Sequence, residues 1–144
     1  MSRVTNHVWV GSFDEAFIED PAQPQWTHIL NVASEINVSE RIGRVYCKCA
    51  VNDDDPNENI REVMPQCIAF IHSAVQSGGI VLVHCWEGKS RSVCAVLAYM
   101  CAHLDYTLDD AYIHVKERRP CVDVFPPYWQ QLTQFCSELP VLET

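Results

Sequence analysis

The segment that most constrains the fold is IVLVHCWEGKSRSVCAVLAYM, residues 80–100. Its first four residues are all apolar, which is typical of a strand buried on both faces of a sheet. A short polar loop follows, and from Ser90 or Arg91 to His103 the chain is apolar again at helical spacing. A buried strand that turns within a few residues into a buried helix is the basic unit of a layered α/β fold.

Three further segments indicate strands. The segment HVWVG closes with Gly11, and THILNVA and RVYCKCAV are apolar, β-branched runs at residues 27–33 and 44–51. Together with strand 80–84, they predict a central sheet whose strands are joined partly by helices. We therefore predict a single α/β domain over residues 1–144, with a mixed sheet of about four or five strands flanked by α-helices.

Three segments besides residues 91–103 have the pattern of helices. Residues 60–76 carry apolar side chains at helical spacing, and Pro65 among them predicts either a kink or a late helix start. Thr107 is suited to cap the helix LDDAYIHVKERR. The segment PPYWQQLTQFCSEL begins with two prolines, which favour the first turn of a helix.

Composition and charge limit the classes of function. The chain has 144 residues, 48% of them hydrophobic, and a formal net charge of −9 at pH 7. This charge disfavours binding to nucleic acid or to anionic membranes, both of which draw on basic surfaces. No apolar run approaches the roughly 20 residues that cross a bilayer, and the N-terminus lacks the apolar core of a signal peptide. We expect no membrane segment. The expected location is the cytoplasm, with the nucleus as an additional location.

Eight cysteines raise the alternatives of a disulfide scaffold or a metal site. The chain is too long and too apolar to need a disulfide scaffold, and several cysteines lie in apolar periodic stretches. Cys47 and Cys49 alternate along a predicted strand, and no close Cys/His pair completes a zinc site. We expect mostly buried thiols, no structural disulfide and no metal.

The loop between strand 80–84 and helix 91–103 has the composition of an anion site. Backbone N–H groups at a helix N-terminus attract phosphate, and the planar guanidinium of Arg91 matches two phosphate oxygens. Such surroundings favour the thiolate form of a cysteine, so we expect Cys85 to be a nucleophile held against bound phosphate. Gly88 permits the turn that this needs. We expect phosphate to bind along the continuous run Trp86, Glu87, Gly88, Lys89, Ser90 and Arg91.

The motif HCWEGKSRS at residues 84–92 resembles the His-Cys-x5-Arg-Ser/Thr signature of the cysteine-dependent protein tyrosine phosphatases, and it is most similar to the dual-specificity branch. The segments VWVGS, THILNVA and LDDAYIHVKERRP also resemble family segments, so the likeness extends over nearly the whole chain. The resemblance implies a protein tyrosine phosphatase-like fold and a metal-independent phosphatase without cofactors. Its expected substrates are phosphorylated proteins, at phosphotyrosine and phosphoserine/threonine.

The resemblance also implies a role for each residue of the motif. Cys85 attacks phosphorus and carries a phosphocysteine intermediate. Arg91 binds phosphate and stabilises the charge of the transition state. Ser92 hydrogen-bonds to the sulfur and eases its departure, and His84 supports the loop and the thiolate rather than transferring a proton.

A leaving alkoxide needs a proton, and family members supply it from an aspartate roughly thirty residues before the cysteine. The segment NDDDPNENI offers Asp53, Asp54 and Asp55. Matching the start of the following helix to that of the family selects Asp54, which lies 31 residues before Cys85. The other two aspartates are expected in a solvated turn or at a helix cap, and both remain alternatives for the acid.

Several alternatives remain open at this level. Lys89 either faces solvent or adds a second cation to the pocket, as in relatives that act on phosphoinositides. A phosphoinositide or other nonprotein phosphate phosphatase is one alternative function, and an inactive phospho-binding module is another. Many family members have Pro-Asn where this chain has Val124-Phe125, so one support of the signature loop is expected to be missing.

Overall fold

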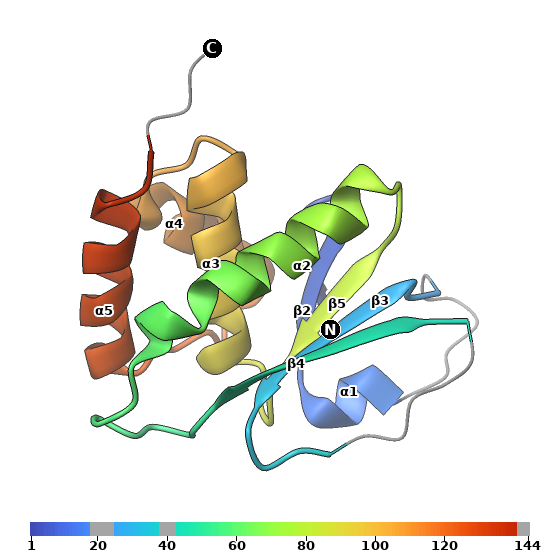
Figure 1. The fold of residues 1–144 in the computed structure, drawn as a ribbon, viewed down its shortest axis with the longest axis horizontal. Helices are drawn as coiled ribbons and strands as arrows, with labels where there is room; N and C mark the ends of the chain where they lie inside the picture. The colour runs from blue at the N-terminus through green and yellow to red at the C-terminus, as the bar shows by residue number, and fades with distance from the viewer. Residues whose placement is uncertain (18–24, 38–42, 141–144) are drawn as a thin grey trace.

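The computed structural model describes residues 1–17, 25–37 and 43–140 (Figure 1). In these residues five strands form one mixed sheet in the order β1-β2-β5-β3-β4. The strands are β1 (Ser2–Arg3), β2 (Val8–Gly11), β3 (His28–Ala33), β4 (Val45–Val51) and β5 (Val81–His84). Only β1 runs antiparallel to its neighbour. The predicted α/β fold with a mixed sheet is confirmed, and β1 was missed because two residues carry no periodicity.

Helices cover both faces of this sheet (Figure 1). Four of them lie on one side, α2 (Met64–Gln76), α3 (Arg91–His103), α4 (Leu108–Arg118) and α5 (Pro126–Ser137), and the short α1 (Phe13–Phe17) lies on the other. A 3-10 turn, η1 (Ile60–Glu62), precedes α2. Helix α1 was not predicted, since five residues are too few for a helical pattern.

Most predicted boundaries hold, with two refinements. Pro65 lies in the first turn of α2, where its missing N–H costs nothing, so the alternative of a late helix start is confirmed. Strand β5 begins one residue later than predicted. Ile80 is held instead by Thr27, whose side-chain oxygen accepts a hydrogen bond of 2.8 Å from the Ile80 N–H. Thr107 caps α4 as expected, by accepting from the N–H of Asp110.

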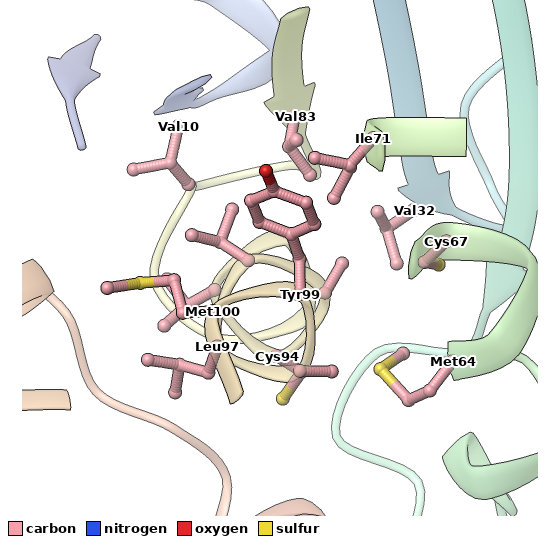
Figure 2. Packing of buried hydrophobic residues seen from close by; sticks show 14 of the residues in the cluster. Val10, Val32, Met64, Cys67, Ile71, Val83, Cys94, Leu97, Tyr99 and Met100 are labelled. Carbon is pink, nitrogen blue, oxygen red and sulfur yellow. The ribbon is translucent and has the colours of Figure 1, made fainter. Parts of the chain in front are cut away.

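The core is built around α3, which is buried over its first ten residues. Figure 2 shows Tyr99 of this helix extending toward Val83 of β5 and Ile71 of α2. On the opposite face of the sheet, Leu82 packs in a smaller cluster with Trp26. Because β5 is buried from both sides and α3 along most of its length, the loop that joins them is held at a fixed place.

The eight cysteines are all free thiols, and Cys67, Cys85 and Cys94 are among those that are buried. In the described ranges, no helix has both the length and the apolar character that crossing a bilayer requires.

Candidate active site

The site begins where β5 ends. Cys85 follows His84 directly and is only 3% exposed. Its sulfur accepts a hydrogen bond from the backbone N–H of Gly88 at 3.3 Å and lies 3.2 Å from the hydroxyl oxygen of Ser92. A hydrogen-bond donor from the loop and a hydroxyl from the first turn of α3 therefore meet at one sulfur.

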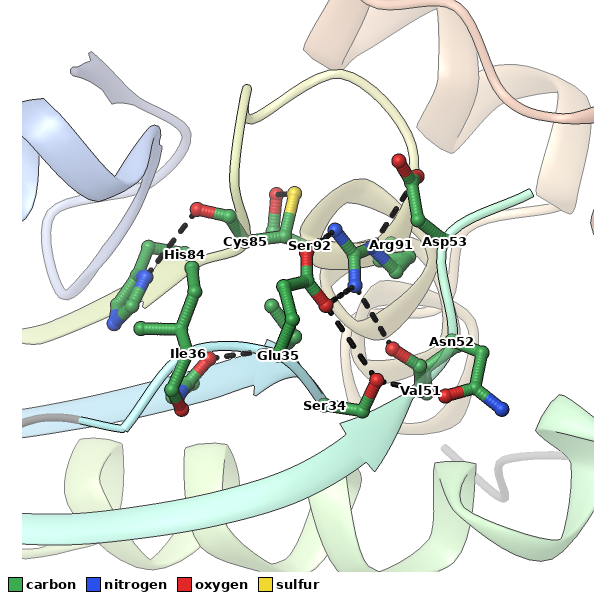
Figure 3. A network of polar contacts seen from close by, with 12 residues as sticks. Ser34, Glu35, Ile36, Val51, Asn52, Asp53, His84, Cys85, Arg91 and Ser92 are labelled. Atoms are coloured by element: carbon green, nitrogen blue, oxygen red, sulfur yellow. Dashed lines mark hydrogen bonds and ion pairs between the residues drawn. The ribbon is translucent and has the colours of Figure 1, made fainter. Parts of the chain in front are cut away.

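Arg91 is the first residue of α3, and its side chain is 2% exposed. Figure 3 shows its guanidinium turned toward the ends of β3 and β4. Nη1 donates to Glu35 at 2.6 Å and to the carbonyl oxygen of Val51 at 2.9 Å, and Nη2 donates to Glu35 at 2.5 Å. The buried charge is thus held by a bidentate carboxylate and by one backbone carbonyl.

Glu35 is a site residue that the sequence analysis missed. It lies in the turn after β3, which Asn31 shapes by donating to the carbonyl oxygen of Ile36 at 2.8 Å and accepting from the N–H of Ala33 at 2.9 Å. The hydrogen bonds from Arg91 lower the pKa of Glu35 to about 2. Its carboxylate is therefore charged at neutral pH and orients the guanidinium.

A guanidinium has five N–H donors, and three are engaged by Glu35 and Val51. The Nε edge lies 3.7 Å from a carboxylate oxygen of Asp53. This edge and the second N–H of Nη2 are the donors that a phosphate would meet. Arg91 is therefore anchored on one side and can bind an anion on the other.

The signature loop is held from behind by a second buried arginine. Arg119, which is 8% exposed, donates from Nε to the carbonyl oxygen of Gly88 at 2.8 Å and from Nη2 to that of Glu87 at 3.2 Å. Nη2 also donates to Glu15 of α1 at 2.7 Å. The carbonyl oxygen of Glu87 points at Arg119, and the N–H of the same peptide group, which belongs to Gly88, therefore points at the sulfur of Cys85.

The segment that contains Val124-Phe125 contacts the signature loop through its backbone. The N–H of Phe125 donates to the hydroxyl oxygen of Ser90 at 3.0 Å, and the N–H of Asp123 donates to the carbonyl oxygen of Lys89 at 3.0 Å. Two backbone groups of the segment before α5 therefore hold the loop, while the support that an asparagine side chain gives in many family members is absent from the sequence.

The three candidate aspartates have different surroundings. Asp53 lies beside Arg91, and the side chain of Asp55 accepts from the N–H of Asn57 at 2.9 Å. Asp54 lines the cavity and has a positive φ of 41°, which residues other than glycine seldom adopt. Burial raises its pKa, and the neighbouring charge of Asp53 adds to this shift. Asp54 thus combines contact with the cavity and a shift toward the protonated form.

The aspartate loop is fastened to α5. The hydroxyl of Tyr128 donates to the carbonyl oxygen of Asn52 and accepts from the N–H of Asp55 at 3.1 Å. Gln131 accepts from the N–H of Ile60 at 2.7 Å and donates to the carbonyl oxygen of Glu58 at 2.8 Å. Four hydrogen bonds from two α5 side chains therefore set the position of the loop that carries Asp54.

These elements enclose a cavity of about 410 Å³. On its rim, the ammonium of Lys89 lies 3.4 Å from the carboxylate of Glu87. Trp86 is 54% exposed and stacks on Phe13 with a centroid distance of 5.4 Å. The lining comes from the aspartate loop, the signature loop and the segment before α5: Asp53, Asp54, Cys85, Trp86, Glu87, Lys89, Ser90, Arg91, Asp123, Val124, Phe125 and Pro126.

His84 lies behind the loop and is fully buried. Its Nδ1 lies 3.4 Å from the carbonyl oxygen of Cys85. Burial lowers the pKa of His84 to about 4, so the imidazole is neutral at physiological pH. A neutral, buried ring suits support of the loop better than proton transfer.

Residues 8–138 match the family model of the dual specificity phosphatase catalytic domain. The chain belongs to the dual-specificity phosphatase family. The resemblance first carried by the motif HCWEGKSRS is thereby confirmed at the level of the family.

Individual relatives agree with this family. Dual specificity protein phosphatase 1 from Arabidopsis thaliana is 40% identical over 106 residues, which are 74% of this chain and 53% of the relative, so the chain spans about half of that protein's length. The crystal structure of human DUSP28 has a TM-score of 0.87 at 29% identity and covers 94% of this chain and 92% of its own. The human tyrosine phosphatase-like serine/threonine/tyrosine-interacting protein has a TM-score of 0.82 at 28% identity, with 95% of both chains covered.

Replacement of Gly88 by alanine tests how closely the dual-specificity phosphatase loop is packed. A Cβ at this position, where φ is +70°, would lie 2.6 Å from the backbone of Gly11 and 2.7 Å from Arg119. We expect Gly88→Ala to lower kcat/KM for an aryl phosphate by about 100-fold or more, because the loop must shift.

Gly78 is the matched control for this variant. Its φ is +77°, and a Cβ there meets no atom within 4 Å. Gly78→Ala therefore introduces similar backbone strain without the clash, and we expect about wild-type kcat/KM, with a loss of stability of about 1 kcal/mol. Equal activity of the two variants would show that the loop tolerates the added methyl group.

Glu35→Gln tests the ion pair with Arg91 through its dependence on pH. Because the pKa of Glu35 falls from 4.5 to about 2 in the folded protein, its stabilising effect is present above about pH 4.5 and is lost as the pH falls toward 2. We expect the variant to be about 1 kcal/mol less stable than the wild type at pH 7, a modest value because the Glu35 side chain is 42% exposed. Urea unfolding should show a smaller difference near pH 3. A difference that is constant with pH would contradict the ion pair.

Proposed function

We propose that this chain is a metal-independent protein phosphatase that hydrolyses phosphotyrosine and phosphoserine/threonine through a phosphocysteine intermediate. One observation carries the proposal: the sulfur of Cys85 accepts from the Gly88 N–H at 3.3 Å and lies in the same cavity as Arg91 and Asp54. A nucleophile, a cation for phosphate and an acid are thus within reach of one substrate group. Membership of the family supports the same activity.

In the first step, the Cys85 thiolate forms a bond to phosphorus while the bond from phosphorus to the leaving oxygen breaks. Asp54 donates its proton to that oxygen, and its raised pKa supports the acid role. The Nε edge of Arg91 and the loop N–H groups stabilise the charge on the three remaining oxygens. Because this charge is met by protein groups, the reaction as proposed requires no metal ion or cofactor.

In the second step, water attacks the phosphocysteine and Asp54 takes the proton from the water. The bond between sulfur and phosphorus breaks, and inorganic phosphate leaves. Ser92, whose hydroxyl oxygen lies 3.2 Å from the sulfur, donates a hydrogen bond that stabilises the departing thiolate. The enzyme returns to its starting state.

The two alternatives have less support. A phosphoinositide phosphatase needs cations for several phosphates, but Lys89 is paired with Glu87 on the rim. An inactive phospho-binding module needs no nucleophile, yet Cys85, Arg91, Ser92 and Asp54 are all present. The proposed substrates are therefore phosphorylated proteins.

Phosphate release in the presence of a chelator tests the proposed function. We expect turnover of phosphotyrosine and phosphothreonine peptides by the wild type, and none by Cys85→Ser, which should still bind the peptides. Turnover of phosphoinositides alone would replace the protein substrates by lipids. A folded wild-type protein that binds phosphopeptides without releasing phosphate would instead be the phospho-binding module.

The choice of acid is tested by comparing leaving groups. Asp54→Asn should lower kcat/KM, which reports the first step, by about 100-fold or more for a phosphothreonine peptide and much less for an activated aryl phosphate, because only the alkoxide requires a proton. Asp53→Asn is the control. Since Asp53 lies 3.7 Å from Arg91, its loss should affect both substrates alike. If Asp53→Asn has the selective effect, then Asp53 is the acid.

A further inference from the structure

Carboxylates dominate the mouth of the catalytic cavity. Asp53, Asp54, Glu87 and Asp123 line it, against the two cations Lys89 and Arg91. The acidic residues would not define a site by themselves, but they surround the cavity that holds Cys85. The pKa of Asp54 is raised first by burial and then by the charge of Asp53; Arg91 opposes this shift, and Asp123 and Glu87 add smaller increases.

The two cations offset only part of the negative charge around the cavity, because Lys89 is paired with Glu87, and Arg91 is shared between Glu35 and Asp53. Arg91 is 2% exposed and is held by Glu35, so its charge acts on the floor of the cavity. Lys89 is paired at 3.4 Å with Glu87 on the rim itself. Asp123 is exposed, and none of the ion pairs found among the described residues includes its carboxylate. The electrostatic potential is therefore positive where the phosphate group binds and negative where the rest of the substrate peptide lies.

We propose that this charge arrangement selects phosphopeptides with arginine or lysine residues beside the phosphorylated side chain. The inference rests on the proposed phosphatase function and adds its substrate class. Glu87 and Asp123 are the specificity-determining residues, because both lie on the rim and neither has a step in the chemistry. Basic flanking residues gain from both carboxylates, whereas acidic peptides and phosphoinositides are repelled.

Backbone hydrogen bonds hold the two segments that carry Glu87 and Asp123 in place. The N–H of Asp123 donates to the carbonyl oxygen of Lys89, so the backbone that carries this carboxylate is fixed relative to the signature loop. Glu87 lies on the same loop, and its carbonyl oxygen accepts from Arg119. Binding of a basic side chain therefore has to order only the side chains of these two residues, and not their backbone.

The experiment compares three phosphotyrosine peptides that differ only in their flanking residues, which are arginine, alanine or glutamate. We expect kcat/KM of the wild type to be about tenfold or more higher for the arginine peptide than for the glutamate peptide at low salt, because each exposed ion pair contributes a few-fold. The ratio should shrink in about 0.5 M salt, which screens exposed charges.

Two double variants separate the rim from the overall charge. Glu87→Gln/Asp123→Asn should reduce the ratio to about threefold or less. Asp105→Asn/Asp109→Asn removes as much charge from exposed residues that line a different cleft, with Cys101 of α3, and should keep the wild-type ratio. A ratio taken within one variant cancels any change in rate that is common to both peptides.

The outcomes distinguish the inference from the function on which it rests. Equal rates for the three peptides, a preference lost equally in both double variants, or faster turnover of phosphoinositides would overturn the basic-peptide preference. In the first two cases phosphatase activity on peptides would stand. Absence of turnover of every peptide and of an aryl phosphate would overturn the proposed function and the inference together.

Discussion

The site depends on one buried charge, the guanidinium of Arg91. Taking such a charge out of water is costly unless it is paired and hydrogen-bonded. Glu35, the carbonyl oxygen of Val51 and, at longer range, Asp53 meet that requirement. These partners come from the turn after β3 and from the end of β4, so satisfying Arg91 also holds the start of α3 against the sheet. The arrangement leaves one edge of the guanidinium for phosphate.

The signature loop is held rigid from two directions. Arg119 binds its carbonyl groups from behind, and the segment before α5 binds Lys89 and Ser90 from the side. Together they fix the loop in one conformation, and with it the direction of the donors that a phosphate requires. Preorganisation of this kind lowers the cost of stabilising a transition state.

Charge changes sign between the floor of the cavity and its rim. The net charge of −9 is spread over the chain, but part of it is gathered where Asp53, Asp54, Glu87 and Asp123 meet. A dianionic phosphate is attracted by the floor, while the rest of the substrate faces carboxylates. Under the proposed function, the nucleophile Cys85 and the rim carboxylates Glu87 and Asp123 therefore belong to separate parts of one cavity.

The α/β class, the strand–loop–helix unit and the candidates Cys85, Arg91 and Ser92 could all be predicted from the sequence, because these features are local and lie within one motif. The sequence also indicated Asp54, by its distance from the motif along the chain. It could not reveal Glu35, which lies 56 residues before its partner Arg91, or Arg119, which lies 31 residues after Gly88. No periodic sequence pattern marks such partners, because acidic or basic residues on several other loops could have made the same contacts. Which loops meet follows from the three-dimensional packing around the buried helix α3, because this packing brings the turn after β3, the end of β4 and the segment after α4 to the same end of the sheet.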